Sequence, residues 1–214
     1  MGLVSRFNLA RIKREYDCSI FFETGTWKGE SVAYAAKSDF KRIFSSEIIP
    51  EIAERAVQRF KDDTRVKIIN QSSTEALENY LQNADGNCIF WLDAHFPGSE
   101  EGIKGYNDED NETLKYPLKK ELQIIAAMRK NYADVILIDD LRIYEKNDYR
   151  NGNMPDNIIR PHEKDSRFVE KLFSDTHNIH RSLRDEGYIY IFPKREKKSS
   201  SISAWKSKLT GKIY

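Results

Sequence analysis

Short apolar runs alternate with amphipathic segments along most of the chain. The apolar runs predict strands at 19–23, 42–47, 66–70, 88–93 and 135–140. Apolar residues at helical spacing predict helices between them, at 8–16, 29–37, 50–60, 72–81 and 117–129. This alternation of strand and helix with short joins is typical of a parallel α/β sheet with helices on both faces.

The C-terminal part changes this pattern. A helix is predicted at 168–173, and two strands at 178–183 and 188–192 form a hairpin around 184–187. We therefore predict an α/β fold: a Rossmann-like, doubly wound, mostly parallel seven-stranded sheet with an antiparallel C-terminal edge strand. Residues 1–193 form a single domain, and 194–214 form a basic, serine-rich tail that either aids solubility or docks on an anionic surface.

Two stretches do not follow the alternation. Residues 96–113 contain glycines, a proline and many acids and asparagines, and 144–165 form a second irregular, polar segment. Loops of this length inside a domain are usually functional. We expect 98–113 to act as a mobile lid that becomes ordered over a substrate.

Polar side chains follow the predicted parallel strands where each strand ends. They are Glu23, Glu47, Asn70, Asp93 and the pair Asp139–Asp140. Because ligands of open α/β sheets bind at the carboxyl ends of the strands, these side chains are expected to face one crevice.

The first strand runs into a glycine-containing turn, Glu23-Thr24-Gly25-Thr26-Trp27-Lys28-Gly29-Glu30-Ser31, and then into a helix. Glycines allow the backbone to approach a ligand closely, and a helix N-terminus offers free N–H groups. The spacing is not the Gly-x-Gly-x-x-Gly of nicotinamide-binding folds. An ordinary strand–helix turn remains an alternative, as does a helix-dipole or surface role for Glu47.

Composition narrows the class of protein. Of the 214 residues, 39% are hydrophobic, which indicates a globular protein. The formal charge of +1 gives no electrostatic argument for nucleic-acid binding. Cys18 and Cys88 lie in or beside apolar runs and are expected to be core thiols. No run is long enough to span a bilayer. We expect a cytoplasmic protein, with a homodimer as the candidate assembly.

The stretch from Phe22 to Ser31 resembles the Glu-x-Gly-x-x-x-Gly-x-Ser motif of class I S-adenosylmethionine-dependent O-methyltransferases. Judged by the order of strands and helices, the resemblance covers about residues 18–193. Within this family, the chain resembles the metal-dependent catechol-type and the macrocin-type sugar O-methyltransferases. The resemblance implies that the turn at Gly25 and Gly29 holds the methionine part of S-adenosylmethionine, with Ser31 near its carboxylate. Glu47 would hold the ribose, and residues 70–73 the adenine edge. The implied cofactor set is Glu23, Gly25, Thr26, Gly29, Ser31, Glu47, Ser72 and Asp93.

The resemblance also implies a metal site. In the metal-dependent relatives, an acid after the fourth strand and acid or amide groups after the fifth hold a divalent ion, which here corresponds to Asp93, Asp139 and Asp140. Oxygen ligands of this kind suit Mg²⁺. This chain departs from the relatives by the inserted acidic stretch and by lacking their Gly-Gly turn before the fifth strand. Asp139 or Asp140 capping a turn is the alternative.

Methyl transfer to a hydroxyl requires a group that removes the hydroxyl proton. His95, two residues after Asp93, is the first candidate for this base, and Asp93 or Asp140 are alternatives. A structural role for His95 stays open. Arg142 either clamps an anionic group of the acceptor or pairs with an acid.

The sequence thus predicts an O-methyltransferase for a hydroxyl, with a sugar of a surface glycan or a secondary metabolite as the preferred acceptor class. The alternatives are a metal-independent N- or carboxyl-methyltransferase, and a non-catalytic nucleotide-binding or interaction module of the same fold.

Overall fold

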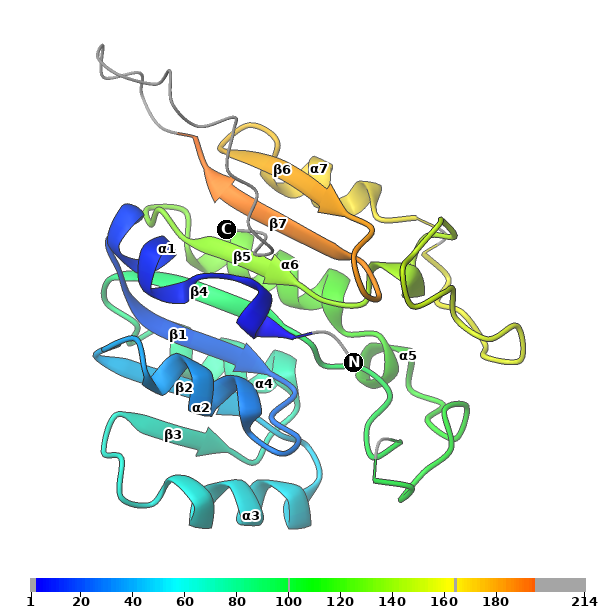
Figure 1. Ribbon diagram of the computed structural model, residues 1–214, viewed down its shortest axis with the longest axis horizontal. Coiled ribbons are helices and arrows are strands. Elements are labelled where there is room, and N and C mark those ends of the chain that lie inside the picture. Colours follow the sequence, from blue (N-terminus) through cyan, green and yellow to red (C-terminus); the bar gives the residue numbers. More distant parts are fainter. Residues whose placement is uncertain (1–2, 100, 164, 195–214) are drawn as a thin grey trace.

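A computed structural model describes residues 3–99, 101–163 and 165–194, so the tail predicted beyond residue 194 lies outside the described part. The described chain forms one seven-stranded sheet of order β3-β2-β1-β4-β5-β7-β6 (Figure 1). The strands are β1 (Cys18–Thr24), β2 (Arg42–Ser46), β3 (Val66–Ile69), β4 (Asn87–Leu92), β5 (Val135–Ile138), β6 (His177–Ser182) and β7 (Tyr188–Pro193).

Strands β1 to β5 are parallel to their neighbours. β7 is antiparallel to both β5 and β6, and it enters the sheet between β5 and the edge. The predicted fold class is therefore confirmed, including the antiparallel C-terminal edge. The carboxyl ends of the five parallel strands lie on the right in Figure 1, where the irregular segments also lie.

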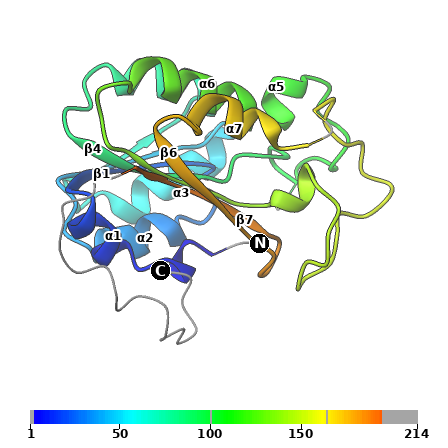
Figure 2. The same cartoon turned by 90° about the horizontal axis from the view of Figure 1, so that it is seen from above.

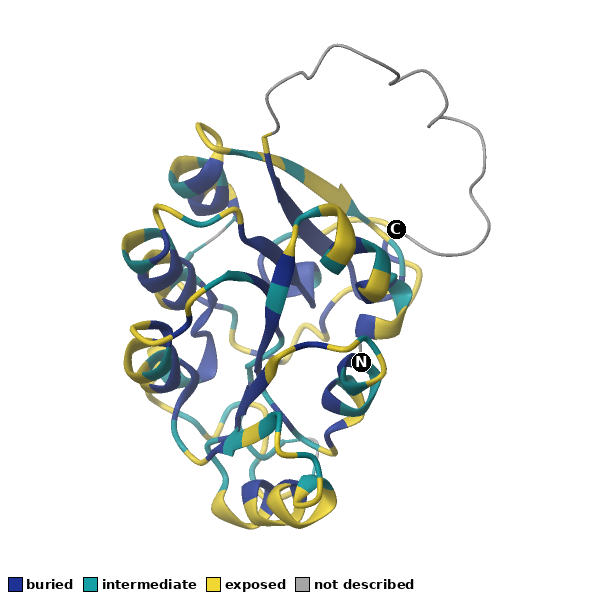
Figure 3. Ribbon diagram, turned by 90° about the vertical axis from the view of Figure 1, so that its left-hand side faces the viewer, coloured by how far each residue is buried: buried dark blue, intermediate teal, exposed yellow. Residues whose placement is uncertain are grey.

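Helices cover both faces of the sheet (Figure 2). Their bounds are α1 (Leu9–Glu15), α2 (Glu30–Ala36), α3 (Pro50–Phe60), α4 (Ser73–Leu81), α5 (Glu112–Lys115), α6 (Leu118–Met128) and α7 (Arg167–Phe173), with 3-10 turns at Val4–Arg6 and Leu141–Ile143. One apolar core joins α1 and α2 to the sheet, and the other joins α4, α6 and α7 to the opposite face. The helices expose their outer sides, whereas the central strands are buried (Figure 3).

Local sequence signals fix several helix starts. The Asn8 side chain accepts the N–H of Arg11 at the start of α1. Pro50 occupies the first position of α3, where its missing N–H has no intrahelical partner to lose. Ser72 and Glu75 form a capping box at α4. These three starts agree with the sequence-based predictions.

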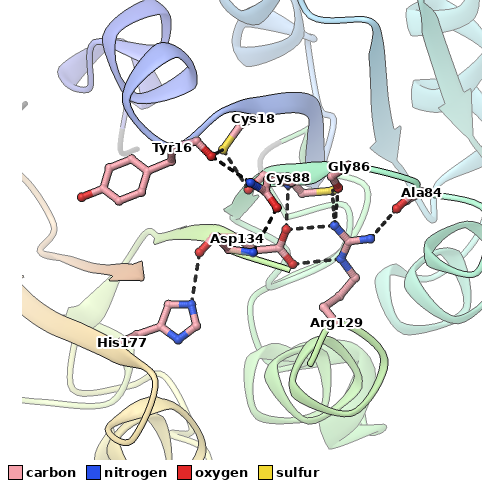
Figure 4. A network of polar contacts seen from close by, with 10 residues as sticks. Tyr16, Cys18, Ala84, Gly86, Cys88, Arg129, Asp134 and His177 are labelled. Atoms are coloured by element: carbon pink, nitrogen blue, oxygen red, sulfur yellow. Dashed lines mark hydrogen bonds and ion pairs between the residues drawn. The ribbon is translucent and has the colours of Figure 1, made fainter. Parts of the chain in front are cut away.

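A buried ion pair ties the amino ends of the central strands together (Figure 4). Arg129 after α6 contacts both carboxylate oxygens of Asp134 at 2.9 Å. Asp134 in turn accepts the backbone N–H of Cys88 at 2.7 Å, and Arg129 also donates to the Gly86 carbonyl. Cys18 and Cys88 are buried free thiols beside this network, as expected for core cysteines.

The N-terminal segment crosses to the C-terminal hairpin. Arg6 makes two hydrogen bonds to Asp185, at 2.8 and 3.0 Å, and the Leu3 N–H donates to the hydroxyl of Tyr188. The buried ring of Phe7 packs edge-on against Tyr188, with ring centroids 5.5 Å apart. These contacts bring Leu3 to the end of the sheet where the parallel strands terminate.

Two irregular segments leave the carboxyl ends of β4 and β5. We call residues 96–116 the first segment and 144–163 the second; they are the green and yellow-green loops on the right of Figure 1. They bind each other through Asn107, whose side chain donates to the Asn157 carbonyl at 2.9 Å and accepts the Ile159 N–H at 3.0 Å. Tyr116 also donates to the Ile159 carbonyl. Among the helices of the described ranges, none combines the length and apolarity needed to cross a membrane.

Candidate functional site

A cavity of about 490 Å³ opens at the carboxyl ends of β1, β2, β4 and β5. Its lining comes from the turn after β1, from 46–48 and 71–73, from the first and second segments, and from Leu3. We call the part around the turn and Glu47 the cofactor end. The part around Asp140 and the second segment is the acceptor end.

The turn after β1 lies directly against β2 and β4. The N–H groups of Gly25 and Thr26 both donate to the Ser46 carbonyl, at 3.0 and 3.1 Å. Gly25 has φ +85°, and a Cβ there would stand 2.8 Å from the carbonyl oxygen of Asp93. Only glycine fits both the conformation and the close approach. Gly25 lines the cavity, whereas Gly29, the residue before α2, is not among the lining residues, and a Cβ there would meet the ring of Phe60.

Glu23 lies beneath the turn and does not line the cavity. Its carboxylate accepts the Ser45 hydroxyl at 2.5 Å, and Ser45 is also 2.6 Å from the hydroxyl of Thr26. Burial raises the pKa of Glu23 to about 8, against the opposing effect of hydrogen bonds from Ser45 and Ser31. The conformation of the turn thus depends on Glu23, while Thr26 and Ser31 reach the cavity surface.

Glu47 faces the cavity just beyond β2. One carboxylate oxygen accepts the Trp27 N–H and the other accepts the Ile49 N–H, each at 3.0 Å. Burial raises the pKa of Glu47, although these N–H groups oppose the rise. Each oxygen keeps a further lone pair, so the carboxylate can accept two hydroxyl protons. Asn70 instead donates to the Glu47 and Ile48 carbonyls and supports the loop.

Serine hydroxyls complete the cofactor end. Ser46 Oγ is buried and has no hydrogen-bond partner within the described part of the chain, although the residue lines the cavity. An orphaned buried hydroxyl at a cavity wall is consistent with a ligand partner. Ser72 and Ser73 also line this wall; Ser72 donates to Glu75 in its capping box at 2.6 Å.

His95, Asp140 and Asp93 meet at the acceptor end. His95 Nε2 lies 3.0 Å from Asp140 Oδ2, and Nδ1 lies 3.8 Å from Asp93 Oδ1. Burial favours protonation of Asp140, but His95 and Arg142 outweigh it and hold the pKa of that carboxyl below its usual value. Burial, with Asp139 and Asp140 nearby, raises the pKa of Asp93 well above its usual value.

Asp139 is not part of this group. Its Oδ1 accepts the Asp140 N–H at 2.8 Å, and its buried Oδ2 has no partner within the described residues. β5 ends at Ile138, and Asp140 adopts the left-handed conformation, with φ +53°, so Asp139 and Asp140 do not follow the alternation of a strand. The structure brings together atoms of Asp93, His95 and Asp140 within 4.8 Å of one another, and Asp139 does not line the cavity.

Most of the residues that line the acceptor end were not predicted from the sequence. They include Leu3, Tyr106, Asn151, Asn153, Met154, Pro155 and Ile158. The irregular composition of the two segments indicated a functional region, but no motif indicated which side chains would point inward.

No family model and no curated protein matches this chain. Solved structures do match it. An SAH-bound methyltransferase of Podospora anserina aligns with TM-score 0.56 and 16% identity over 87% of this chain and 76% of that one. The O-methyltransferase TomG of Streptomyces achromogenes, involved in tomaymycin synthesis and bound to SAM, aligns with TM-score 0.55 and 15% identity over 91% and 82%.

An rRNA methylase of Streptococcus thermophilus also matches, with TM-score 0.52 and 16% identity over 87% of this chain and 94% of that one. Identities this low carry information about the fold and not about the acceptor, and the matched proteins themselves differ in acceptor. The chain has the fold that these methyltransferases share.

Proposed function

We propose that the protein is an S-adenosylmethionine-dependent O-methyltransferase that acts on a hydroxyl of a small molecule. The observation that carries the proposal is a single cavity with a glycine turn and Glu47 at one end and a His95–Asp140 pair at the other. The shared fold supports it.

The cofactor end suits the S-adenosyl group. The close approach at Gly25 leaves room for the methionine part beside Ser31, and the two Glu47 oxygens accept the ribose hydroxyls. The orphaned Ser46 hydroxyl and the wall at 71–73 offer polar partners to the rest of the nucleoside. The cofactor supplies an electrophilic methyl group, and the chain positions it towards the acceptor end.

His95 acts as the base in this proposal. Asp140 accepts the Nε2 proton of His95, which places the lone pair on Nδ1. The Nδ1 atom removes the proton of the acceptor hydroxyl as the methyl group transfers. Asp140 stays ionised because its pKa is low, so it stabilises the imidazolium that forms. Asp93 borders the same space and remains a candidate partner for the hydroxyl.

The residues do not fit the predicted Mg²⁺ site of Asp93, Asp139 and Asp140. Asp139 does not line the cavity, and the group that does form contains an imidazole, whereas Mg²⁺ prefers oxygen ligands. Both oxygens of Asp140 are also engaged, by His95 and Arg142. We therefore propose a metal-independent reaction at a hydroxyl, and we place a sugar or another small hydroxyl compound at the acceptor end.

The test begins with SAH titrated calorimetrically into the protein, which should show saturable binding. Labelled methyl transfer from S-adenosylmethionine to a panel of neutral diols and sugars then follows. His95→Gln should reduce transfer by about 100-fold or more while SAH affinity is unchanged. Absence of SAH binding would indicate a different module of the same fold. Transfer that stops in chelator would restore the metal-dependent mechanism.

A further inference from the structure

The first segment also reaches the cofactor end of the cavity. Gly98 and Glu101 of this segment line the cavity together with Trp27 and Glu47. A Cβ at Gly98 would stand 3.6 Å from Cδ1 of Ile49, so the segment lies close to the loop that follows β2. The segment therefore borders the space that the proposed function assigns to the nucleoside.

The carboxylate of Glu101 joins this segment to two other elements. Its Oε1 accepts the indole N–H of Trp27 at 3.0 Å, and its Oε2 accepts an N–H of Arg55 in α3 at 2.9 Å. Hydrogen bonds from Arg55 and Trp27, with Lys28 nearby, hold the pKa of Glu101 below its usual value, so the carboxylate is charged at neutral pH. We call these two contacts the Glu101 clasp.

Trp27 connects the clasp to the proposed ribose site. Its backbone N–H donates to Glu47, whereas its indole N–H donates to Glu101. The ammonium group of Lys28 lies 4.4 Å from the centre of the Trp27 ring. Because hydrogen bonds to the Ser46 carbonyl fix the turn that carries Trp27, the clasp ends on a rigid wall.

The other side of the clasp is held differently. The N–H of Gly102 donates to the Ser99 carbonyl at 3.1 Å, and the N–H of Ile103 donates to the Gly98 carbonyl at 3.0 Å. These bonds lie within the first segment, so they persist when this part of the segment moves as a unit. The inner side of α3 is buried in the domain and stays in place. Opening of the clasp therefore moves the first segment and breaks the two contacts of Glu101.

We propose that the Glu101 clasp is the gate of the cofactor end: it must open before S-adenosylmethionine enters and before SAH leaves, so Glu101 sets the rate of cofactor exchange. This inference rests on the proposed methyltransferase function, which supplies the cofactor. The sequence-based expectation was a lid over the substrate, whereas the clasp assigns this part of the first segment to the cofactor.

The experiment measures how fast labelled SAH exchanges with the full chain. The association rate constant comes from rapid mixing at several SAH concentrations, and the dissociation rate constant comes from a chase with excess unlabelled SAH. Glu101→Ala removes both contacts of the clasp, and Arg55→Ala removes only the contact to α3. Thermal melting establishes that each variant is folded.

Glu109→Ala is the matched control. Glu109 lies in the same segment, its side chain is 17% exposed against 19% for Glu101, and it pairs with Lys104 at 2.9 Å. It is not among the described residues that line the cavity. This variant therefore loses the same charge and a similar ion pair without touching the cofactor end.

We expect Glu101→Ala to raise both the association and the dissociation rate constants of SAH by about fivefold or more, because the gate then opens without breaking two charged hydrogen bonds. Arg55→Ala should raise both by a smaller factor. Because entry and exit accelerate together, the equilibrium affinity of Glu101→Ala should stay within about threefold of wild type. Glu109→Ala should exchange SAH at the wild-type rate.

Salt provides a second readout. The Arg55 side chain is 61% exposed, so added KCl should screen its attraction to Glu101. SAH exchange should therefore accelerate with KCl in wild type and in Glu109→Ala, and it should respond less in Glu101→Ala. A role of Glu101 in stability alone would not produce this difference.

Wild-type exchange rates in Glu101→Ala overturn the inference. So does a variant in which only dissociation accelerates, because Glu101 would then stabilise bound SAH without gating its entry. Both results leave the proposed function intact, since SAH still binds. Failure of wild type to bind SAH overturns the proposed function instead, and this inference falls with it.

Discussion

The two ends of the cavity are held in place by different kinds of contact. At the cofactor end, apart from the Glu101 clasp, the contacts are made to backbone groups of neighbouring elements: the N–H groups of Gly25 and Thr26 donate to the Ser46 carbonyl, and the carboxylate of Glu47 accepts two backbone N–H groups. At the acceptor end, side-chain hydrogen bonds between distant segments accompany a few backbone bonds, such as the one from the Asn151 N–H to the Asp185 carbonyl. Asn107 joins the first segment to the second, and Asn151 and Glu186 join the second segment to the hairpin.

This difference sets how each end tolerates change. A backbone turn pressed against a strand has no room to adjust, so a single added carbon should disrupt it. A set of side-chain hydrogen bonds on exposed segments can lose one member and keep the rest. A single substitution should therefore have a large effect at the cofactor end and a small effect at the acceptor end.

Gly25→Ala should have the largest effect. The added Cβ would meet the Asp93 carbonyl at 2.8 Å, so the turn must move, and we expect about 100-fold weaker SAH binding by calorimetry. Gly152→Ala is the matched control: Gly152 has φ +80°, but nothing lies within 4 Å of its added Cβ. Equal losses in both variants would show that backbone strain, and not the close approach, decides the effect.

Glu47→Ala should weaken SAH binding by about 1–3 kcal/mol, because it removes a charged hydrogen-bond acceptor from the ribose and leaves the Trp27 and Ile49 N–H groups without their partner. Unchanged calorimetric affinity would contradict the ribose assignment. Glu54→Ala, an exposed acid on α3, provides the control for a change of net charge.

Glu23→Gln should change how stability depends on pH. The folded state keeps the Glu23 proton up to about pH 8, whereas an unfolded chain loses it near the ordinary pKa of 4.5, so between these values the wild type loses stability as pH rises. The variant lacks this loss. Relative to wild type, its free energy of unfolding should rise by about 1.4 kcal/mol per pH unit in that window, measured by urea unfolding near pH 6 and pH 7. Parallel pH profiles would count against a protonated Glu23.

Asn107→Ala should have the smallest effect, and it tests the acceptor end. Loss of its bonds to Asn157 and Ile159 should cost about 1 kcal/mol, seen as roughly fivefold faster hydrogen exchange at the Ile159 amide. SAH affinity should stay within about twofold of wild type. Asn178→Ala in β6 is the control. A large loss of SAH affinity in Asn107→Ala would mean that the two ends are not independent.

The same difference between the two ends of the cavity explains how much of each could be predicted from the sequence. Strands, helix starts and the glycine turn are encoded within short stretches, so hydrophobic spacing and the residues around Gly25 and Glu47 were sufficient to place them. The alternation of a strand could place Asp139 and Asp140 on opposite sides, but it could not predict the left-handed conformation of Asp140, which depends on its surroundings. Asn151, Met154 and Leu3 reach the cavity through contacts with sequence-distant residues, which no local pattern records.

The contact between Arg6 and Asp185 has a consequence for how the protein is made. These residues are 179 positions apart, and Leu3 and Tyr188 are 185 apart. A ribosome therefore releases the N-terminal segment long before it synthesises the hairpin on which that segment rests. Such long-range contacts slow folding, because the chain must close a large loop before they form. Residues 3–7 thus leave the ribosome long before they reach their final place, and the acceptor end, which includes Leu3, is completed only after the whole sheet has been synthesised.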